Sequence, residues 1–296
     1  MTIQLKVKGI IPPMVTPLDK NENIDKKAIE RVVNYLIKGG VHGVFPLGST
    51  GEWYGFDFEK KKEIIETVME VTNKRVPVYV GTGAITTKET ISFTRLATDI
   101  GVDAVSVITP VFISPNAQEL YNHYQAIASS TDLPIILYNN PGRTGINLSV
   151  DLVIKLSKIE NIVGIKDSSG DMTQGAEYIR RTADDFAVLA GRDTLIYGFL
   201  SYGGKGAIAA TANIVLQIVV KIYEEYQKGH YQKALKAQFQ LAPLRMAFNL
   251  GSFPVVIKEG LKLLGIDVGS TLKPIEPLTK EAREKLKEVL HNMQIL

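Results

Sequence analysis

Short apolar runs alternate with amphipathic helical patterns along most of the chain. In the helical segments apolar residues recur at a spacing of 3.6, as in KKAIERVVNYLIKGG (26–40) and KKKEIIETVMEVTNK (60–74). Asp, Thr or Ser often precedes such a segment and Gly or Asn often follows it, as helix capping predicts. The apolar runs are predicted strands, and they cover residues 10–16, 41–48, 77–83, 102–110, 134–141, 162–167, 186–191 and 206–213.

Strands that alternate with helices of this length predict an α/β fold with parallel strands joined by crossovers. Eight such units in roughly the first 225 residues match a closed (β/α)₈ TIM barrel, which we assign to residues 1–228 as the catalytic domain. The alternative is a doubly wound open sheet, which normally carries a glycine fingerprint after its first strand. That position holds PPMVTPLD (12–19), so the pattern favours the barrel.

The remainder of the chain, residues 229–296, contains only helical patterns. These patterns cover residues 231–248, 256–265 and 280–293. We expect them to form a C-terminal helical appendage, packed on the barrel or at a subunit contact.

Composition narrows the classes of function. Thirty-four Lys and Arg residues against 31 Asp and Glu residues leave a net charge of +3, and no basic patch with interleaved aromatic residues appears, so nucleic acid is not expected as a partner. The chain has no cysteine, which excludes disulfides, iron–sulfur clusters and thiol catalysis. No signal-peptide core and no run of about 18 apolar residues is present. We therefore expect a soluble cytoplasmic protein with no membrane partner.

Lys166 closes the apolar strand IVGIKD (162–167), and in a barrel the active site lies at the carboxyl-terminal ends of the strands. Alternation puts Lys166 on the same side as Gly164, which would leave an empty layer beneath the lysine stem. A lysine removed from water is more easily kept neutral, and its amine can then attack a carbonyl to form a Schiff base. Alternatively, Lys166 leaves the strand end and pairs with Asp167 or with water.

Three other candidates lie at predicted strand ends. In GSTGE (48–52), the N–H groups and hydroxyls of Ser49 and Thr50 can hold an anion and Thr50 can relay protons; otherwise these residues cap an ordinary turn. Tyr138 can act as a general acid and base beside a Schiff-base lysine, or it is only an aromatic residue of the barrel rim. Arg143 can hold a carboxylate in a bidentate fork, or it forms a salt bridge at a subunit contact.

Weaker candidates follow the next strands. The AGRDT segment holds Gly191 and Asp193 as candidate substrate-binding residues, and the Asp193 carboxylate either contacts substrate hydroxyls or forms a surface salt bridge. GGKGAIAATAN (203–213) is a phosphate loop or a tight turn that admits substrate, and we favour the turn. The four histidines lack metal-ligand spacing, so we expect no metal ion, and we expect no cofactor.

Taken together, these motifs resemble the dihydrodipicolinate synthase/N-acetylneuraminate lyase family of class I aldolases. GSTGE, YNNPGRTG, GIKDSSG and GAIAATAN fall in the family's order, and the resemblance covers essentially the whole chain. It implies that Lys166 forms a Schiff base with pyruvate or another 2-keto acid and that Tyr138 shuttles protons. Ser49 and Thr50 would hold the keto-acid carboxylate, and Ile208 would line the same pocket. The resemblance also implies a homotetramer built as a dimer of dimers.

Several positions depart from the synthases of that family. Synthases usually carry two threonines in the glycine loop, where this chain has Ser49 and then Thr50, and two tyrosines where it has Val111 and Phe112. The second tyrosine completes a proton relay across a subunit interface in those enzymes. Phe112 has no hydroxyl for that role.

Other positions bear on regulation and on the second substrate. A common version of the family's lysine-inhibition site has asparagine and histidine where this chain has Ile85 and Lys61, so we expect no feedback inhibition by lysine. Arg143 matches the arginine that holds the carboxylate of the aldehyde substrate in the synthases, and N-acetylneuraminate lyases lack it.

The sequence therefore predicts a lyase that works through a Lys166 Schiff base with a 2-keto acid. Because of Arg143, the first specific expectation is the condensation of pyruvate with the aldehyde aspartate semialdehyde. The alternative is a catabolic aldolase or dehydratase for 2-keto-3-deoxy sugar acids or hydroxyproline-derived keto acids, which Ser49 and the missing tyrosine pair suggest. A barrel that binds a keto acid without turnover and a phosphate-binding isomerase are the remaining alternatives.

Overall fold

The computed structural model describes residues 5–296, which form two compact units. The first unit holds Tyr79–Ile208 together with the segment that ends at Gly9. The second unit holds Ile10–Val78 and Ala209–Leu296. No helix within residues 5–296 combines the length and the apolar character needed to cross a membrane.

The first unit is built on a sheet whose strand order is β1-β7-β6-β5-β4-β3-β2. All neighbouring pairs from β2 to β7 are parallel. β3 (AVSVI) and β4 (IILYN) are buried at every position, as expected for parallel strands that are covered on both faces. The strands are β1 (Gly9–Ile10), β2 (Tyr79–Gly81), β3 (Ala104–Ile108), β4 (Ile135–Asn139), β5 (Ile162–Asp167), β6 (Ala187–Ala190) and β7 (Gly206–Ala207).

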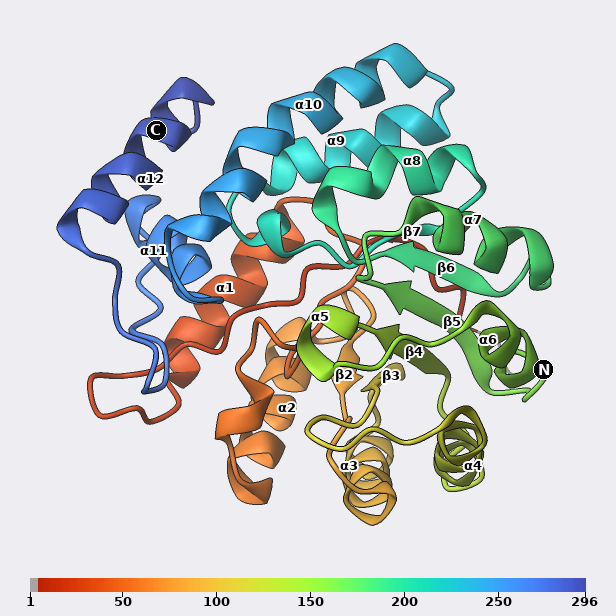
Figure 1. Ribbon diagram of the computed structural model, residues 1–296. Helices are drawn as coiled ribbons and strands as arrows, with labels where there is room; N and C mark the ends of the chain where they lie inside the picture. The colour runs from red at the N-terminus through yellow and green to blue at the C-terminus, as the bar shows by residue number, and fades with distance from the viewer. Residues whose placement is uncertain (1–4) are drawn as a thin grey trace. The chain divides into compact units, whose positions relative to one another are not determined.

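Crossover helices of this unit lie outside the sheet (Figure 1). Side-chain caps fix where several of them begin: Thr86 caps α3, Asn116 caps α4 in a full capping box, and Asp171 caps α7. The helices are α3 (Thr87–Ile100), α4 (Ala117–Ala128), α5 (Pro141–Thr144), α6 (Val150–Leu156), α7 (Met172–Arg181), the 3₁₀ turn η2 (Asp193–Leu195) and α8 (Ile196–Ser201).

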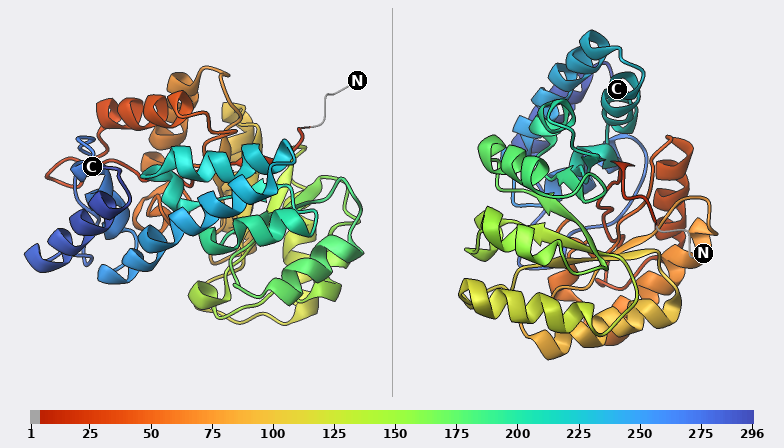
Figure 2. Two further views of the ribbon diagram at one scale, coloured as in Figure 1. Left: turned by 90° about the horizontal axis from the view of Figure 1, so that it is seen from above. Right: turned by 90° about the vertical axis from the view of Figure 1, so that its right-hand side faces the viewer.

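The second unit is mainly helical. α9 and α10 pack against each other, as Figure 2 shows, and α10 and α11 both contact α12. The helices are α1 (Lys26–Lys38), η1 (Trp53–Gly55), α2 (Phe58–Thr72), η3 (Ala210–Asn213), α9 (Leu216–Gln227), α10 (Tyr231–Ala247), η4 (Phe248–Leu250), α11 (Val255–Leu263) and α12 (Lys280–Asn292).

The apolar run 41–48 forms no regular strand, which is a difference from the prediction. It makes only isolated parallel bridges, Pro13 with Phe45 and Val44 with Val78. Pro46 lies in this segment. The two segments that it bridges also carry prolines, Pro12 and Pro13 in one and Pro77 beside Val78 in the other. Since proline has no N–H to donate, a continuous hydrogen-bonded ladder cannot form there.

The other predicted elements are largely confirmed. The remaining seven apolar runs each contain a strand or overlap one, and the three C-terminal helical patterns form α10, α11 and α12. These three helices belong to the same compact unit as residues 10–78. The predicted division of the chain at residue 228 stays a prediction.

Candidate active site

Lys166 and Tyr138 lie opposite each other near the carboxyl ends of β5 and β4. They are register partners in the parallel ladder, and the Lys166 Nζ is 4.0 Å from the centre of the Tyr138 ring. Lys166 is 4% exposed and Tyr138 is 5% exposed. An amine and a phenol are thus held together, largely shielded from water.

A second contact orients the phenol. The Asn140 side-chain amide donates a hydrogen bond of 2.9 Å to the Tyr138 hydroxyl oxygen. The hydroxyl oxygen is the acceptor in this bond, so the amide fixes the position of the phenol. Sequence reasoning missed Asn140, although it stands in the same YNNP stretch as Tyr138.

Gly164 does not leave the empty layer that the sequence predicted beneath Lys166. A Cβ at Gly164 would lie 2.5 Å from the carbonyl oxygen of Ala187 and 3.0 Å from its Cβ. Gly164 and Ala187 are register partners in β5 and β6. The glycine therefore allows close approach of the neighbouring strand, two residues before the lysine.

The Asp167 carboxylate is bonded to groups other than Lys166. Its carboxylate accepts hydrogen bonds from the Asn139 amide (2.9 Å), the Ser169 hydroxyl (2.8 Å) and the Ser169 N–H (3.1 Å). Burial raises the pKa of Asp167, and these hydrogen bonds oppose the rise. Asn139 and Asp167 are register partners one residue beyond Tyr138 and Lys166, so their bond fixes the alignment of the pair.

Arg143 lies in α5, the short turn that follows β4. The turn is closed by backbone bonds from the Arg143 N–H (2.9 Å) and the Thr144 N–H (3.1 Å) to the Asn140 carbonyl oxygen. The Arg143 side chain is exposed. It is therefore placed at the rim beyond the end of the strand that carries Tyr138.

Gly191, Asp193 and Ile208 follow the ends of β6 and β7. A Cβ at Gly191 would lie 2.1 Å from the Ser168 Oγ and 2.8 Å from the Asp167 carbonyl oxygen, so a larger residue would displace the β5 end. Asp193 is buried at 3% exposure, so it does not lie on the surface, and its contact with substrate stays a prediction. Ile208 is buried, and its N–H donates to the Ala190 carbonyl oxygen (2.9 Å).

Six of the predicted site residues therefore belong to the first unit. They stand at or just after the carboxyl ends of four neighbouring strands, β4 to β7. Parallel strands bring such ends to one edge of a sheet, which is where active sites of this architecture lie. The six are Tyr138, Arg143, Lys166, Gly191, Asp193 and Ile208.

The GSTGE loop belongs to the second unit and forms a tight turn. The Gly51 N–H donates to the Gly48 carbonyl oxygen (3.0 Å), and the Thr16 hydroxyl donates to the Gly51 carbonyl oxygen (2.7 Å). Thr50 is buried and Ser49 is half-buried. Within residues 5–296, the N–H and hydroxyl groups of Ser49 and Thr50 donate no hydrogen bond to the protein. These donors are available to an anion.

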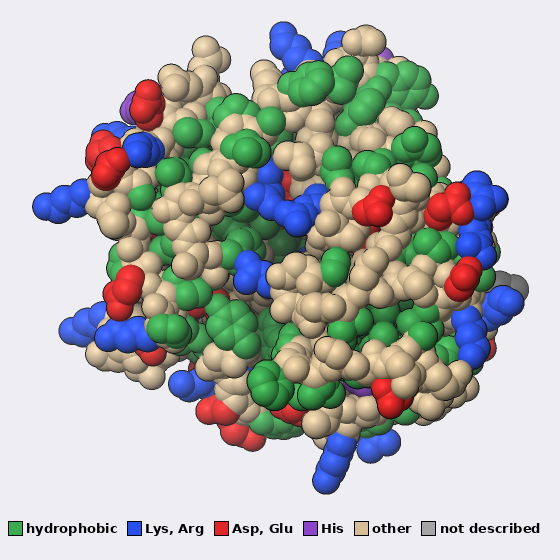
Figure 3. All heavy atoms as spheres, in the orientation of Figure 1, with side chains coloured by type: hydrophobic (Ala, Val, Ile, Leu, Met, Phe, Trp, Pro, Cys, Tyr) green, Lys and Arg blue, Asp and Glu red, His purple; other side chains and the backbone are tan. Residues whose placement is uncertain are grey.

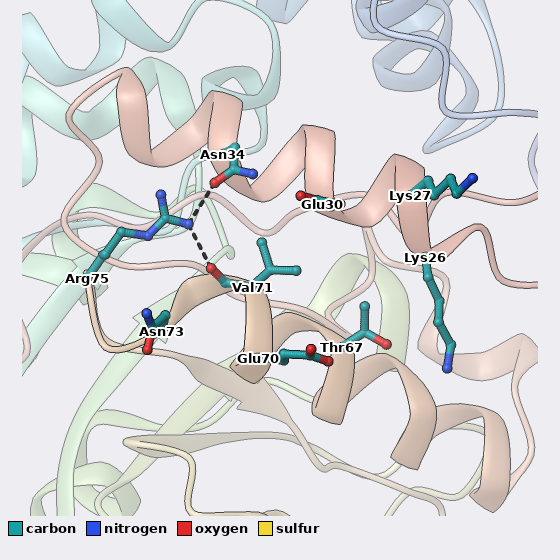
Figure 4. Close-up of a pocket in the computed structure, with 9 residues that line it drawn as sticks. All are labelled: Lys26, Lys27, Glu30, Asn34, Thr67, Glu70, Val71, Asn73 and Arg75. Atoms are coloured by element: carbon teal, nitrogen blue, oxygen red, sulfur yellow. Dashed lines mark hydrogen bonds between the residues drawn. The ribbon is translucent and has the colours of Figure 1, made fainter.

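A separate groove of about 500 Å³ lies between α1 and α2 in the second unit (Figure 4). Polar and charged side chains line it, and Arg75 reaches across to the Asn34 side-chain oxygen (2.7 Å) and to the Val71 carbonyl oxygen (2.7 Å). None of the predicted site residues lines this groove.

On the face drawn in Figure 3, basic and acidic side chains are interspersed along the edges, and a group of Lys and Arg side chains gathers near the centre. Within residues 5–296, no group of three or more His, Asp and Glu side chains is arranged to hold a metal ion.

Comparisons with known proteins extend over nearly the whole chain. The model of the Dihydrodipicolinate synthetase family matches residues 6–293. The 4-hydroxy-tetrahydrodipicolinate synthase of Methanospirillum hungatei is 40% identical over 96% of this chain and 98% of its own length.

Solved structures agree with these sequence matches. Dihydrodipicolinate synthase DapA-2 of Bacillus anthracis superposes with a TM-score of 0.94 at 39% identity, covering 98% of each chain. YagE of Escherichia coli K12, a prophage protein of the dihydrodipicolinic acid synthase family that was solved in complex with pyruvate, superposes with a TM-score of 0.96. It is 32% identical, over 99% of this chain and 100% of its own.

Proposed function

The chain belongs to the dihydrodipicolinate synthetase family, and from this premise we propose that it is a Schiff-base lyase that condenses pyruvate with aspartate semialdehyde. The observation that carries the proposal is the Lys166–Tyr138 pair, with 4.0 Å between the amine and the ring centre. A buried amine beside a phenol supplies a nucleophile and a group that can accept and return protons.

The reaction follows from these two groups. The neutral Lys166 amine attacks C2 of pyruvate, and the carbinolamine loses water to form an imine. The imine nitrogen withdraws electrons, so a proton leaves C3 and the resulting enamine attacks the aldehyde carbon. Tyr138 accepts and returns protons during these steps, held in place by Asn140. The amino group of the condensed aspartate semialdehyde then attacks C2, the bond between C2 and the Lys166 nitrogen breaks, and the amine of Lys166 is regenerated as the cyclic product is released.

The remaining site residues take binding roles in this proposal. Ser49 and Thr50 hold the keto-acid carboxylate through N–H and hydroxyl donors, and Thr50 takes part in proton transfer. Ile208 and Gly191 form walls of the keto-acid site. Arg143 binds the carboxylate of the aldehyde substrate, and the buried Asp193 contacts its polar groups.

Phe112 favours a second candidate function. It is 95% exposed, it has a φ of 72° and it carries no hydroxyl where the synthases have their relay tyrosine. An L-residue in this backbone region is uncommon and clusters at functional positions. A catabolic aldolase or dehydratase for 2-keto-3-deoxy or hydroxyproline-derived keto acids would need no such relay.

We also propose the closed (β/α)₈ barrel and the homotetramer. The parallel bridges of residues 44 and 45, to Val78 on one side and Pro13 on the other, support the segment as the strand that closes the barrel. Exposed apolar side chains support subunit contacts: Phe112 after β3, and Phe239 and Met246 on one side of α10. Sedimentation velocity tests the tetramer. A cytoplasmic location remains an expectation from the sequence.

Borohydride trapping tests the proposed function directly. The protein is incubated with pyruvate and reduced, and the adduct is located by intact-mass and peptide mass spectrometry. A pyruvyl adduct on Lys166 is expected, and an adduct on another lysine would overturn the assignment. Steady-state rates with a series of aldehydes then distinguish the two candidate functions. Strong turnover of pyruvate with aspartate semialdehyde would rule out the catabolic function.

A further inference from the structure

The loop that carries Ser49 and Thr50 ends in a buried ion pair. The Glu52 Oε1 lies 2.7 Å from the Lys258 Nζ, and the two side chains are 0% and 1% exposed. The other carboxylate oxygen, Oε2, accepts a hydrogen bond of 2.7 Å from the Leu272 N–H. The pair therefore ties the loop to α11 and to the segment that follows it.

Lys258 has a second bond on the same side. Its ammonium donates to the Ser270 carbonyl oxygen at 2.7 Å. Leu272, two residues later, packs over η1, because a Cβ at Gly55 would lie 2.2 Å from the Leu272 Cδ1. The 270–272 segment is thus fastened both to the ion pair and to the turn just after the loop.

A contribution to the stability of the fold does not by itself explain the buried Glu52–Lys258 ion pair. Two charges taken out of water lose hydration that their attraction only partly restores, and apolar residues of similar volume often stabilise a protein as well or better. Burial lowers the pKa of Lys258, and the neighbouring Glu52 opposes that change. Burying the Glu52–Lys258 pair costs hydration energy, but its short bonds hold the attached backbone segments in one conformation.

The conformation it fixes is that of the loop backbone. Glu52 has φ 55° and ψ 36°, in the left-handed region that L-residues seldom adopt. The Glu52 N–H donates to the Ser49 carbonyl oxygen at 3.3 Å, and the Gly51 N–H closes the turn on Gly48. A change in the backbone of Glu52 would therefore turn the peptide groups of Ser49 and Thr50.

We propose that Glu52 and Lys258 are positioning residues, which hold the 48–52 loop so that Ser49 and Thr50 can bind the keto-acid carboxylate. This inference rests on the proposed function, since it assigns the loop to that carboxylate. Neither residue touches the reacting atoms. Their loss therefore weakens keto-acid binding more than it slows the chemical steps.

The test compares four variants with the wild-type protein: Glu52→Gln, Lys258→Met, the double variant of both, and Glu259→Gln. Glu259 is the matched control, because it is the next residue of α11, is largely buried and pairs with Lys262 (2.9 Å) and Arg283 (3.3 Å), both outside the loop. Each is measured for thermal unfolding, for kcat and KM, and for the pyruvate concentration that half-saturates borohydride trapping.

Both single variants are expected to raise the KM and the half-saturating concentration for pyruvate by about tenfold or more, with kcat within about threefold of wild type. The Glu259→Gln variant keeps the wild-type KM. The double variant removes both buried charges together, so it regains thermal stability while its KM stays raised.

Two outcomes would overturn the inference alone: a wild-type KM in the folded single variants, or a double variant that regains both stability and KM. The latter would mean that the pair only stabilises the fold. A wild-type protein that forms no adduct with pyruvate would instead overturn the proposed function, and the positioning role with it.

Discussion

Tyr138 and Lys166 are partners in adjacent parallel strands, and the amine of the lysine lies over the face of the tyrosine ring at 4.0 Å from its centre. The next residue of each strand makes a second link, because the Asn139 amide donates to the Asp167 carboxylate at 2.9 Å. The buried hydrogen bond fixes the register that places Tyr138 opposite Lys166, the pair we propose as catalytic. Chemistry and alignment thus come from consecutive residues of β4 and β5.

Replacing Lys166 with Met is expected to abolish borohydride trapping by pyruvate and to lower kcat by about 1,000-fold or more, because the nucleophile is gone. Lys155 offers a matched control. Its Nζ also lies over an aromatic ring, 3.9 Å from the centre of Tyr121, but its side chain is exposed. The Lys155→Met variant should keep both trapping and turnover. Trapping that survives in Lys166→Met would place the Schiff base elsewhere.

The Tyr138→Phe substitution removes one hydroxyl and keeps the ring beneath Lys166. We expect kcat to fall by about 10²- to 10⁴-fold, the usual contribution of a general acid or base. The amine remains, so prolonged incubation with pyruvate and borohydride should still label Lys166. Stopped-flow trapping and steady-state rates measure the two effects separately. A kcat close to wild type would assign the proton transfers to another group.

Arg143→Ala tests the identity of the second substrate. If Arg143 binds the aldehyde's carboxylate, its loss removes charge-assisted hydrogen bonds worth about 1.5–3 kcal/mol, so the KM for aspartate semialdehyde should rise by roughly 10- to 100-fold. The KM for pyruvate should stay unchanged. Arg181, which pairs with Asp151 at 2.7 Å on the surface, provides the control variant Arg181→Ala. An equal rise in both KM values would contradict a role specific to the aldehyde.

Much of the fold could be predicted because buried parallel strands leave a simple pattern. β3, β4 and β5 are short apolar runs, and the polar residues that close β4 and β5 mark the edge where the site lies. Lys166 and Tyr138 were predicted on that basis. Their contact was not, since it depends on the register between β4 and β5, which strand patterns alone do not determine.

Other parts of the site depend on contacts that sequence patterns do not show. Glu52 and Lys258 are far apart in the sequence and stand in unrelated patterns, and only the fold makes them an ion pair. Gly164 was predicted to leave space, but it accommodates the backbone of β6. The run 41–48 lacks a regular strand because prolines interrupt the hydrogen-bond donors on both sides.

We expect L-lysine not to inhibit the enzyme. Lys61 is 7% exposed, and its Nζ lies 5.4 Å from the centre of the Trp53 ring. A cation at this position repels the ammonium groups of a lysine ligand, where the common version of the site has a histidine. Initial rates measured with increasing L-lysine should stay constant, with a lysine-sensitive synthase as the positive control. Saturable inhibition would contradict this prediction.

His123 couples folding to pH. Its Nδ1 lies 2.9 Å from the Thr87 hydroxyl, while its Nε2 is buried without a hydrogen-bond partner among residues 5–296. Burial lowers the pKa of His123 from 6.5 to about 4. Below pH 6.5 the unfolded chain therefore binds a proton that the folded protein does not bind until about pH 4. The free energy of unfolding must fall as the pH falls through this range.

The full effect of that shift is on the order of 3 kcal/mol, so the folded protein should lose stability steadily between pH 6.5 and pH 4. The His123→Gln variant keeps a group that can bond to Thr87 and cannot titrate, and it should show a flatter dependence in this range. His291 is the control, because its side chain is exposed in the last turn of α12, and His291→Gln should keep the wild-type slope. Urea unfolding at several pH values measures all three proteins. If His123→Gln has the same slope as wild type, other groups cause the loss of stability in acid. Asp167 is not one of these groups, because its pKa is raised in the folded protein. A carboxyl group with a raised folded pKa makes the free energy of unfolding fall as the pH rises, which is the opposite direction.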